Sequence, residues 1–159
     1  MIRRTFLLLA LAACARPYDG PPVTEVRIYK ARRKMELWSG TRRLSSFDIA
    51  LGGNPQGHKQ QRGDSRTPEG VYHIDRRNPN SAFHLSLGIS YPDAADVARA
   101  QAMGVDPGGD IFIHGTGRFP PNSLYRQGDW TDGCIAVTNE QMNDIYTMVQ
   151  DGTRVVIWP

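Results

Sequence analysis

Short apolar runs with the two-residue period of β-strands recur along this chain, and turns rich in glycine and proline separate them. The run Val23–Tyr29 places Val26 and Ile28 on one side, and Leu44–Leu51 repeats the pattern before it ends at a glycine pair. Such a succession of short strands is typical of consecutive β-hairpins. The sequence therefore predicts a domain that is built mainly from β-strands.

Further strands and two helices are expected in the rest of the chain. The expected strands cover residues 71–74, 83–89, 111–114 and 153–158, with a turn over residues 76–80. An alanine-rich stretch from Pro92 to Gly104 has helical character. Asn139 is a suitable N-cap for a second helix that carries Met142 and Ile145 on one face. The predicted fold class is mainly β with two short helices, arranged as a β-sandwich or a barrel-like sheet.

The N-terminal residues are typical of an export signal. A basic start, Met1–Arg4, precedes the apolar run Phe6–Ala13, which is too short to cross a bilayer. The run ends in Leu11–Cys14, which resembles the lipobox of bacterial lipoproteins, where the cysteine is lipidated and becomes the first mature residue. The alternative is an ordinary signal peptide that is cleaved nearby, so that Cys14 is discarded.

The expected organisation is a signal peptide over residues 1–14, a tether over residues 15–22 and one folded domain over residues 23–159. The predicted location is the periplasm or cell envelope, with the membrane contacted through an N-terminal lipid. Loss of Arg3 and Arg4 with the leader reduces the formal charge from +3 to +1, and the remaining arginines are scattered. No nucleic-acid partner is therefore indicated.

The chain has two cysteines, Cys14 and Cys134. If Cys14 is lipidated or removed, Cys134 has no disulfide partner in an oxidising compartment, where an unused thiol is a liability. A disulfide between the two cysteines, or burial of Cys134 as a small apolar side chain, is the structural alternative. The export signal favours a thiol that is used in chemistry.

Two short loops each place a reactive side chain beside a glycine. His114 ends the apolar run Ile111–His114 and precedes Gly115, and Cys134 follows Gly133. An imidazole can take the proton of a neighbouring thiol, and the thiolate then attacks a carbonyl carbon. The resulting oxyanion needs N–H donors, for which the backbone of Gly133 and Cys134 is the candidate. The pattern suits nucleophilic catalysis, with Cys134 as the nucleophile and His114 as the general base. From residue type alone, a structural role is the alternative for each of them, because a lone histidine at a strand end is more often structural.

A zinc site is an alternative use of the same residue types, in which Asp132 or His84 would join Cys134 and His114 as ligands. The sequence contains neither a C-x-x-C nor an H-x-x-x-H spacing, so the metal signal is weak. We therefore expect neither a metal nor an organic cofactor.

The two loops together resemble the active-site signature of the L,D-transpeptidase catalytic domain family, which is also called YkuD-like. That signature joins a His-Gly strand end, through a spacer, to Ser/Thr-x-Gly-Cys and an aliphatic residue. Here sixteen residues separate His114 from Thr131, and Thr131–Ile135 completes the pattern. The stretches that are similar to the YafK-like branch of the family are residues 83–87, 90–92, 107–111 and 131–139.

The resemblance implies a peptidoglycan substrate and a catalytic role for the domain. Family enzymes attack the bond between the third and fourth residues of a stem peptide and hold the acyl group on the cysteine. An amine then takes the acyl group, which gives a cross-link or attaches a wall lipoprotein. The residues expected at the oxyanion or substrate-binding site are Gly115, Thr131, Asp132, Gly133, His84 and Tyr91. Tyr125 is a further candidate for the groove, and packing is the alternative role of His84.

Two positions depart from the family pattern. Asp132 stands where many members have histidine, and Ala136 stands where they have arginine, which removes an anchor for a substrate carboxylate. Water can also resolve an acyl-enzyme, so a hydrolase or amidase that cuts a stem-peptide amide is the first alternative function. The second is a wall-binding lipoprotein without catalysis, against which the presence of both Cys134 and His114 speaks.

Overall fold

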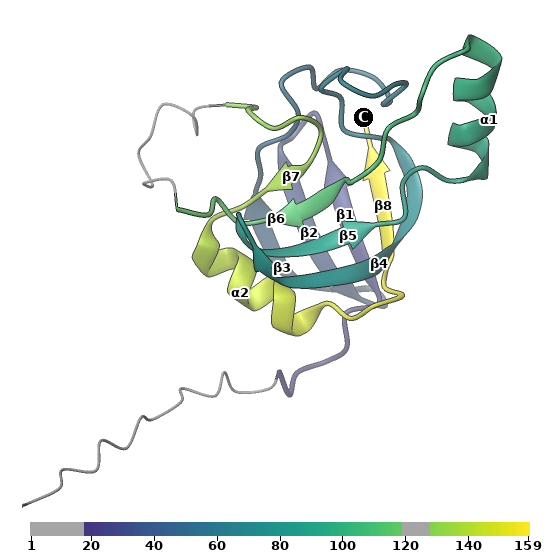
Figure 1. Cartoon of the computed structure of the whole chain (residues 1–159). Helices are drawn as coiled ribbons and strands as arrows, with labels where there is room; N and C mark the ends of the chain where they lie inside the picture. Colours follow the sequence, from purple (N-terminus) through teal and green to yellow (C-terminus); the bar gives the residue numbers. More distant parts are fainter. Residues whose placement is uncertain (1–17, 119–127) are drawn as a thin grey trace, which may run out of the picture.

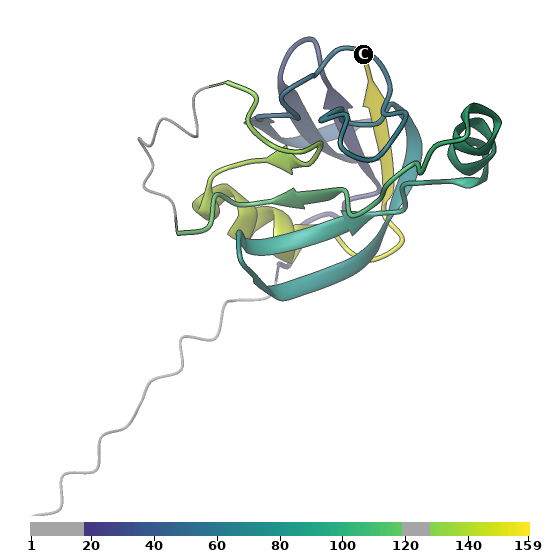
Figure 2. The same cartoon turned by 45° about the horizontal axis from the view of Figure 1, so that its top comes forward.

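The computed structural model describes residues 18–118 and 128–159, and its strands form one strongly curved sheet (Figures 1 and 2). The strands lie in the order β3-β2-β1-β8-β4-β5-β6-β7. Their bounds are β1 Glu25–Tyr29, β2 Lys34–Ser39, β3 Arg42–Asp48, β4 Gly70–Ser81, β5 His84–Ile89, β6 Phe112–His114, β7 Ile135–Ala136 and β8 Arg154–Trp158. The helices of the described residues are α1 (Ala94–Met103) and α2 (Asn139–Met148). The prediction of a mainly β domain with two short helices is confirmed.

The sheet closes on itself in a barrel-like manner. β1, β2 and β3 pair as the two expected hairpins, whereas β1 pairs with β8 and β6 pairs with β7 in parallel. Two isolated bridges, Ala50 to Ala136 and Gly52 to Thr131, connect the chain after β3 to the opposite edge of the sheet. This closure brings the segment after β3 beside the loop that precedes Cys134.

Aliphatic side chains fill the interior of the curved sheet. Val26 and Ile28, which the strand period placed on one side, are both fully buried. The other strands and α2 contribute Met35, Leu37, Ile74, Leu87, Ile89, Ile113, Ile135, Val155, Ile157, Met142, Ile145 and Val149. Burial of one such side chain stabilises the fold by about 1.5–3 kcal/mol. β6 and β7 span three and two residues, so the buried Ile113 and Ile135 hold these strands in place more than their own pairing does.

β4 is longer than predicted. The expected turn over residues 76–80 is wrong, because β4 continues to Ser81 in spite of Pro79. Its register against β5 shifts twice over this stretch. The Arg77 guanidinium lies 4.0 Å from the Tyr146 ring centroid and donates a hydrogen bond of 2.6 Å to the Val149 carbonyl oxygen. Contacts with α2 and the chain that follows it therefore override the local turn signal.

The two helices have different relations to the sheet. α1 projects from one side of it in both views (Figures 1 and 2), whereas α2 packs against β5. α1 begins at the N-cap Asp93 and ends at Gly104, as predicted. For α2 the predicted N-cap is wrong by one residue, because Thr138 accepts the Gln141 N–H and forms a capping box with Gln141. Asn139 is the first residue inside the helix, and its side chain is free for another role.

The expected signal peptide, its Cys14 and the groove candidate Tyr125 lie outside the described residues. Within residues 18–118 and 128–159, no helix is long and apolar enough to cross a membrane.

Candidate active site

His114 lies at the end of β6, and only 4% of it is exposed. Its Nδ1 atom lies 2.5 Å from the Gly115 carbonyl oxygen. Because a carbonyl oxygen only accepts, Nδ1 must carry the proton, which leaves the lone pair on Nε2. The ring forms a cluster with Phe83 and Trp130, at centroid distances of 4.6 and 5.8 Å, and those two rings lie 6.1 Å from one another. Burial lowers the pKa of His114, so the imidazole is neutral at neutral pH and has a lone pair to accept a proton.

Cys134 lies directly before β7, with its thiol turned toward the chain that precedes β6. The Sγ atom donates a hydrogen bond of 3.5 Å to the Asp110 carbonyl oxygen. Burial raises the pKa of this thiol, the Phe112 N–H opposes the rise, and the carboxylates of Asp132 and Asp110 add to it. The Cys134 thiol is therefore protonated at neutral pH.

The pairing of β6 with β7 brings the two reactive residues together. His114 lies opposite Ala136 in this parallel pair, and Cys134 precedes Ala136 by two residues. The segments that carry Cys134 and His114 therefore run side by side, while the thiol itself is turned toward the Asp110 carbonyl group.

A hydroxyl group braces the loop that ends in Cys134. Thr131 Oγ1 donates to the Cys134 carbonyl oxygen at 2.7 Å and accepts the Gly133 N–H at 3.1 Å. Gly133 has φ +126°, and a Cβ atom there would lie 2.6 Å from the Arg66 carbonyl oxygen, so only glycine fits. The Gly133 N–H, expected as an oxyanion donor, is already engaged, which leaves the Cys134 N–H as the candidate donor.

A salt bridge that sequence reasoning missed anchors the same loop. The Asp129 carboxylate accepts the Leu51 N–H at 2.9 Å and pairs with the Arg33 guanidinium at 2.6 Å. Thr131 extends the anchor, because its N–H donates to the Leu51 carbonyl oxygen and its own carbonyl oxygen accepts the Gly53 N–H. Arg33 and Asp129 are 96 positions apart, so no local sequence pattern could reveal the pair.

A cavity of about 390 Å³ opens beside Cys134. It is lined by Lys59, Arg62, Gly63, Gly108, Gly109, Asp110, Ile111, Asp132 and Cys134. The polar loop over residues 54–69 supplies one wall. Asp64 organises that wall, because it accepts the N–H groups of Gln60 and Gln61 and pairs with Lys59 at 2.8 Å. Burial alone would raise the pKa of Asp64, but these hydrogen bonds outweigh it and hold the pKa at about 2.

The remaining predicted residues occupy different places. Asp132 lines the cavity beside Cys134, and Gly115 supplies the carbonyl oxygen that holds His114. Tyr91 is buried, and its hydroxyl donates to the Pro107 carbonyl oxygen at 2.9 Å, so it supports the cavity wall from behind. His84 is exposed, and its Nε2 lies 2.7 Å from Asn143 Oδ1 on α2.

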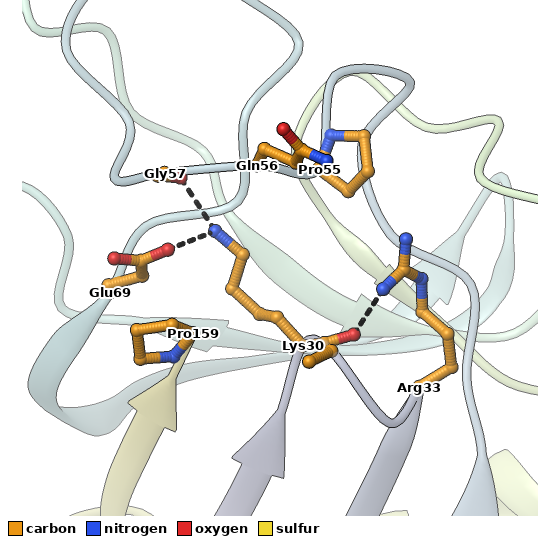
Figure 3. Close-up of a pocket in the computed structure, with 8 residues that line it drawn as sticks. Lys30, Arg33, Pro55, Gln56, Gly57, Glu69 and Pro159 are labelled. Atoms are coloured by element: carbon orange, nitrogen blue, oxygen red, sulfur yellow. Dashed lines mark hydrogen bonds and ion pairs between the residues drawn. The ribbon is translucent and has the colours of Figure 1, made fainter.

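Two other cavities differ in their chemistry. One of about 200 Å³ is lined by Asp48, Ala50, Thr116, Trp130, Ala136, Val137 and Thr138, which include no basic side chain. Another of about 470 Å³ surrounds Lys30 (Figure 3) and contains neither reactive residue. The Lys30 amine donates to Gly57, Thr67 and Glu69, so all three of its protons are used within the fold.

Zinc was the alternative use of Cys134 and His114. Across the parts of the chain that the structure describes, no group of three or more His, Cys, Asp or Glu side chains could hold a metal ion.

Comparison with known proteins identifies the relatives of this chain. Residues 24–157 match the family model described as "L,D-transpeptidase catalytic domain". The chain is 29% identical over 154 residues to "Putative L,D-transpeptidase YafK" of Escherichia coli K12, a match that covers 88% of this chain and 55% of that protein. It thus spans about half the length of the curated relatives it matches.

Solved structures share the fold. The helical cell shape determining protein Pgp2 from Campylobacter jejuni superposes with a TM-score of 0.67 at 26% identity, over 89% of this chain and 49% of that chain. An L,D-transpeptidase from Mycobacterium smegmatis gives a TM-score of 0.57 at 13% identity, over 88% and 60% of the two chains. The second likeness, at such low identity, concerns the fold alone.

Proposed function

The chain belongs to the L,D-transpeptidase catalytic domain family, and from this premise we propose that it transfers acyl groups of peptidoglycan stem peptides through a thioester on Cys134. One observation carries the proposal. The support is that His114 carries its proton on Nδ1, which leaves Nε2 free, and that its strand β6 pairs with β7, the strand that directly follows Cys134. A neutral imidazole beside a thiol is the arrangement that nucleophilic acyl transfer needs.

The chemistry proceeds in two balanced steps. His114 Nε2 takes the thiol proton, and Sγ attacks the carbonyl carbon of the scissile amide, with the Cys134 N–H beside the developing oxyanion. The C–N bond then breaks, and the imidazolium returns its proton to the departing D-alanine amine. In the second step an acceptor amine attacks the thioester, His114 removes a proton from that amine, and the thiol is restored.

Hydrolysis of the same thioester is the second candidate, and one observation favours it. Ala136 lines the 200 Å³ cavity, where none of the lining side chains is basic. An acceptor that carries a carboxylate therefore finds no positive charge there. Water, which needs no such anchor, can then take the place of the amine, so the protein would cut stem-peptide amides.

Product analysis separates these functions. The chain, solubilised in detergent, is incubated with purified peptidoglycan in the presence of a labelled D-amino acid, and muramidase-digested products are read by mass spectrometry. Incorporated label or new cross-links indicate transfer, whereas shortened stem peptides without label indicate hydrolysis. Cys134→Ser should abolish either product, and Cys14→Ser is the matched control that should retain activity. Absence of any product that depends on Cys134 would leave the wall-binding lipoprotein as the function.

We also propose that the protein resides in the cell envelope and is lipidated at Cys14. The support is the lipobox-like stretch Leu11–Cys14 and the wall substrate that the family implies. Cells grown with a labelled fatty acid should label the wild-type chain and leave Cys14→Ser unlabelled. Equal labelling of both would refute the anchor without affecting the catalytic proposal.

A further inference from the structure

The side chain of Asn139 makes four hydrogen bonds to the turn that follows His114. Its Oδ1 atom accepts the Thr116 N–H at 2.8 Å, the Thr116 hydroxyl at 3.1 Å and the Gly117 N–H at 3.0 Å. Its Nδ2 atom donates to the Gly117 carbonyl oxygen at 2.8 Å. Two fixed backbone donors face Oδ1 and a fixed backbone acceptor faces Nδ2, so the orientation of the amide is determined by its partners.

The helix that carries Asn139 does not need this side chain. Thr138 and Gln141 already form the capping box of α2. Inside a helix asparagine is less favourable than alanine, because it competes for backbone hydrogen bonds. The amide of Asn139 is therefore directed at the turn over residues 115–117, and the N-terminus of α2 is capped without it.

That turn contains the carbonyl group that holds His114. Gly115 accepts the Nδ1–H of His114, and the next two residues are the ones that Asn139 binds. The fit is tight, because a Cβ atom on Gly115 would lie 2.5 Å from Asn139 Oδ1. Asn139 also follows Cys134 by only five positions, so it joins the segment of the nucleophile to the turn of the base.

We propose that Asn139 is a positioning residue that fixes the Gly115 carbonyl group and so holds His114 in the tautomer with a free Nε2 lone pair. The tautomer is a property of the resting protein. Only one part of the proposal rests on the proposed function, namely that the Nε2 lone pair of His114 takes the proton of the Cys134 thiol.

Nuclear magnetic resonance tests the tautomer without any need for turnover. The full chain, labelled with ¹⁵N-histidine, is recorded as wild type, Asn139→Ala and Asn143→Ala at about pH 7.5, above the ordinary histidine pKa. We expect the wild type to show His114 protonated at Nδ1 and Asn139→Ala to show a mixture of tautomers. Asn143 contacts His84, so Asn143→Ala is the matched control that should alter His84 and leave His114 unchanged. An unchanged His114 pattern in Asn139→Ala overturns the proposal, even if activity is lost.

Kinetics give a second readout on whichever product the protein forms. Asn139→Ala should lower kcat by about 10- to 100-fold with little change in KM, because general-base catalysis contributes about 10²–10⁴-fold. The Gly115 hydrogen bond raises the pKa of His114, so its loss should move the acid limb of the pH profile to lower pH. Asn139→Asp keeps the acceptor and adds a negative charge, so its acid limb should move to higher pH. If the acid limbs of the pH profiles of Asn139→Ala and Asn139→Asp coincided, Asn139 would be a purely structural residue and the proposal would be overturned.

Asn139→Asp also guards against loss of folding. It retains an acceptor for the Thr116 and Gly117 N–H groups, so it should remain folded even if Asn139→Ala does not. A folded Asn139→Asp protein with the wild-type acid limb would then reject the proposal by itself.

Discussion

The segment that carries Cys134 and the segment that carries His114 are held in different ways. The nucleophile follows a loop that is fixed at several independent points. Thr131 braces it from within, the salt bridge of Arg33 with Asp129 anchors it to the chain around Leu51, and the barrel closure adds backbone pairing. No single one of these contacts determines where the Cys134 backbone lies.

The backbone of His114 is held by strand pairing on both sides, because the residue lies opposite Ser86 in β5 and Ala136 in β7. Its ring packs against Phe83 and Trp130, but its tautomer depends on one carbonyl group. The turn that presents this carbonyl is bound by the side chain of Asn139. Apart from the two reactive residues themselves, we therefore expect loss of an anchor of the Cys134 loop, as in Asp129→Asn, to affect mainly stability. We expect Asn139→Ala, which acts on His114, to affect mainly turnover.

Replacement of the reactive residues themselves should have the largest effect. Cys134→Ser and His114→Ala should each reduce turnover by more than about 10³-fold, because neither step proceeds without both groups. Their stabilities should differ. His114→Ala leaves a cavity beside the rings of Phe83 and Trp130 and should lower the free energy of unfolding by about 3 kcal/mol, whereas Cys134→Ser should change it by less than about 1 kcal/mol. Urea denaturation measures both values, and retained turnover in either variant would refute the assigned roles.

Gly133→Ala tests how tightly the loop of the nucleophile is packed. The new methyl group would lie 2.6 Å from the Arg66 carbonyl oxygen at a φ of +126°. Strain and crowding together should lower the free energy of unfolding by roughly 2–4 kcal/mol, and displacement of Cys134 should reduce turnover by about 10²-fold.

Gly40→Ala is the matched control for that substitution. Gly40 has φ +57°, and no neighbouring atom lies within 4 Å of the position that a methyl group would occupy, so only the backbone strain applies. Its cost should be about 1 kcal/mol, without loss of turnover. A Gly133→Ala protein as stable and active as Gly40→Ala would show that the loop is not tightly packed.

Asp129→Asn should sharpen the difference between the two segments. The variant weakens the salt bridge with Arg33 and keeps an acceptor for the Leu51 N–H, so it should cost about 1–2 kcal/mol of unfolding free energy. Because Thr131 and the barrel closure remain, kcat should fall by no more than about tenfold. A fall in kcat as large as that expected for Asn139→Ala would contradict the difference between the two segments. Asp75→Asn, at an exposed ion pair with Arg76, is the control and should change neither quantity.

The sequence predicted these segments unequally as well. Strand period located the pairing elements. The expected export signal and the unpaired thiol drew attention to Cys134, and the family resemblance decided the role predicted for it. Local patterns failed where distant contacts decide the structure. The turn expected at residues 76–80 is strand because Arg77 binds the chain around α2, and the Arg33–Asp129 anchor has no local signal.

Asn139 shows the same limit in a different form. Its position and type were consistent with an N-cap, so sequence reasoning assigned it that role. The structure gives the cap to Thr138 and turns the amide toward the base. A capping box with Gln141 was visible in the sequence as Thr138-Asn139-Glu140-Gln141 and would have freed Asn139 for another role. The hydrogen bonds to Thr116 and Gly117 depend on tertiary folding and were not predictable.

The smallest expected effect concerns the protonation of the resting pair. Burial raises the pKa of Cys134 and lowers the pKa of His114, so both groups are neutral in the free protein at neutral pH. Iodoacetamide should therefore alkylate Cys134 slowly at about pH 7, with a rate that still rises above the ordinary thiol pKa of about 8.5. An apparent pKa well below that value would indicate a thiolate–imidazolium pair and would make the two segments electrostatically dependent on each other at rest.

Stability at alkaline pH provides the control for that measurement. The pKa of Cys134 is higher in the folded than in the unfolded chain. Its contribution to the free energy of unfolding is therefore full below the unfolded pKa of about 8.5. That contribution is lost as pH rises through the pKa of the folded chain. Cys134→Ser should lack this part of the alkaline loss, so the two unfolding free energies should converge between about pH 8 and pH 10. If the free energies of unfolding of the wild type and Cys134→Ser changed in parallel with pH, the thiol would titrate in the folded chain as it does in the unfolded chain. Convergence would mean that the substrate, and not the resting site, triggers proton transfer to His114.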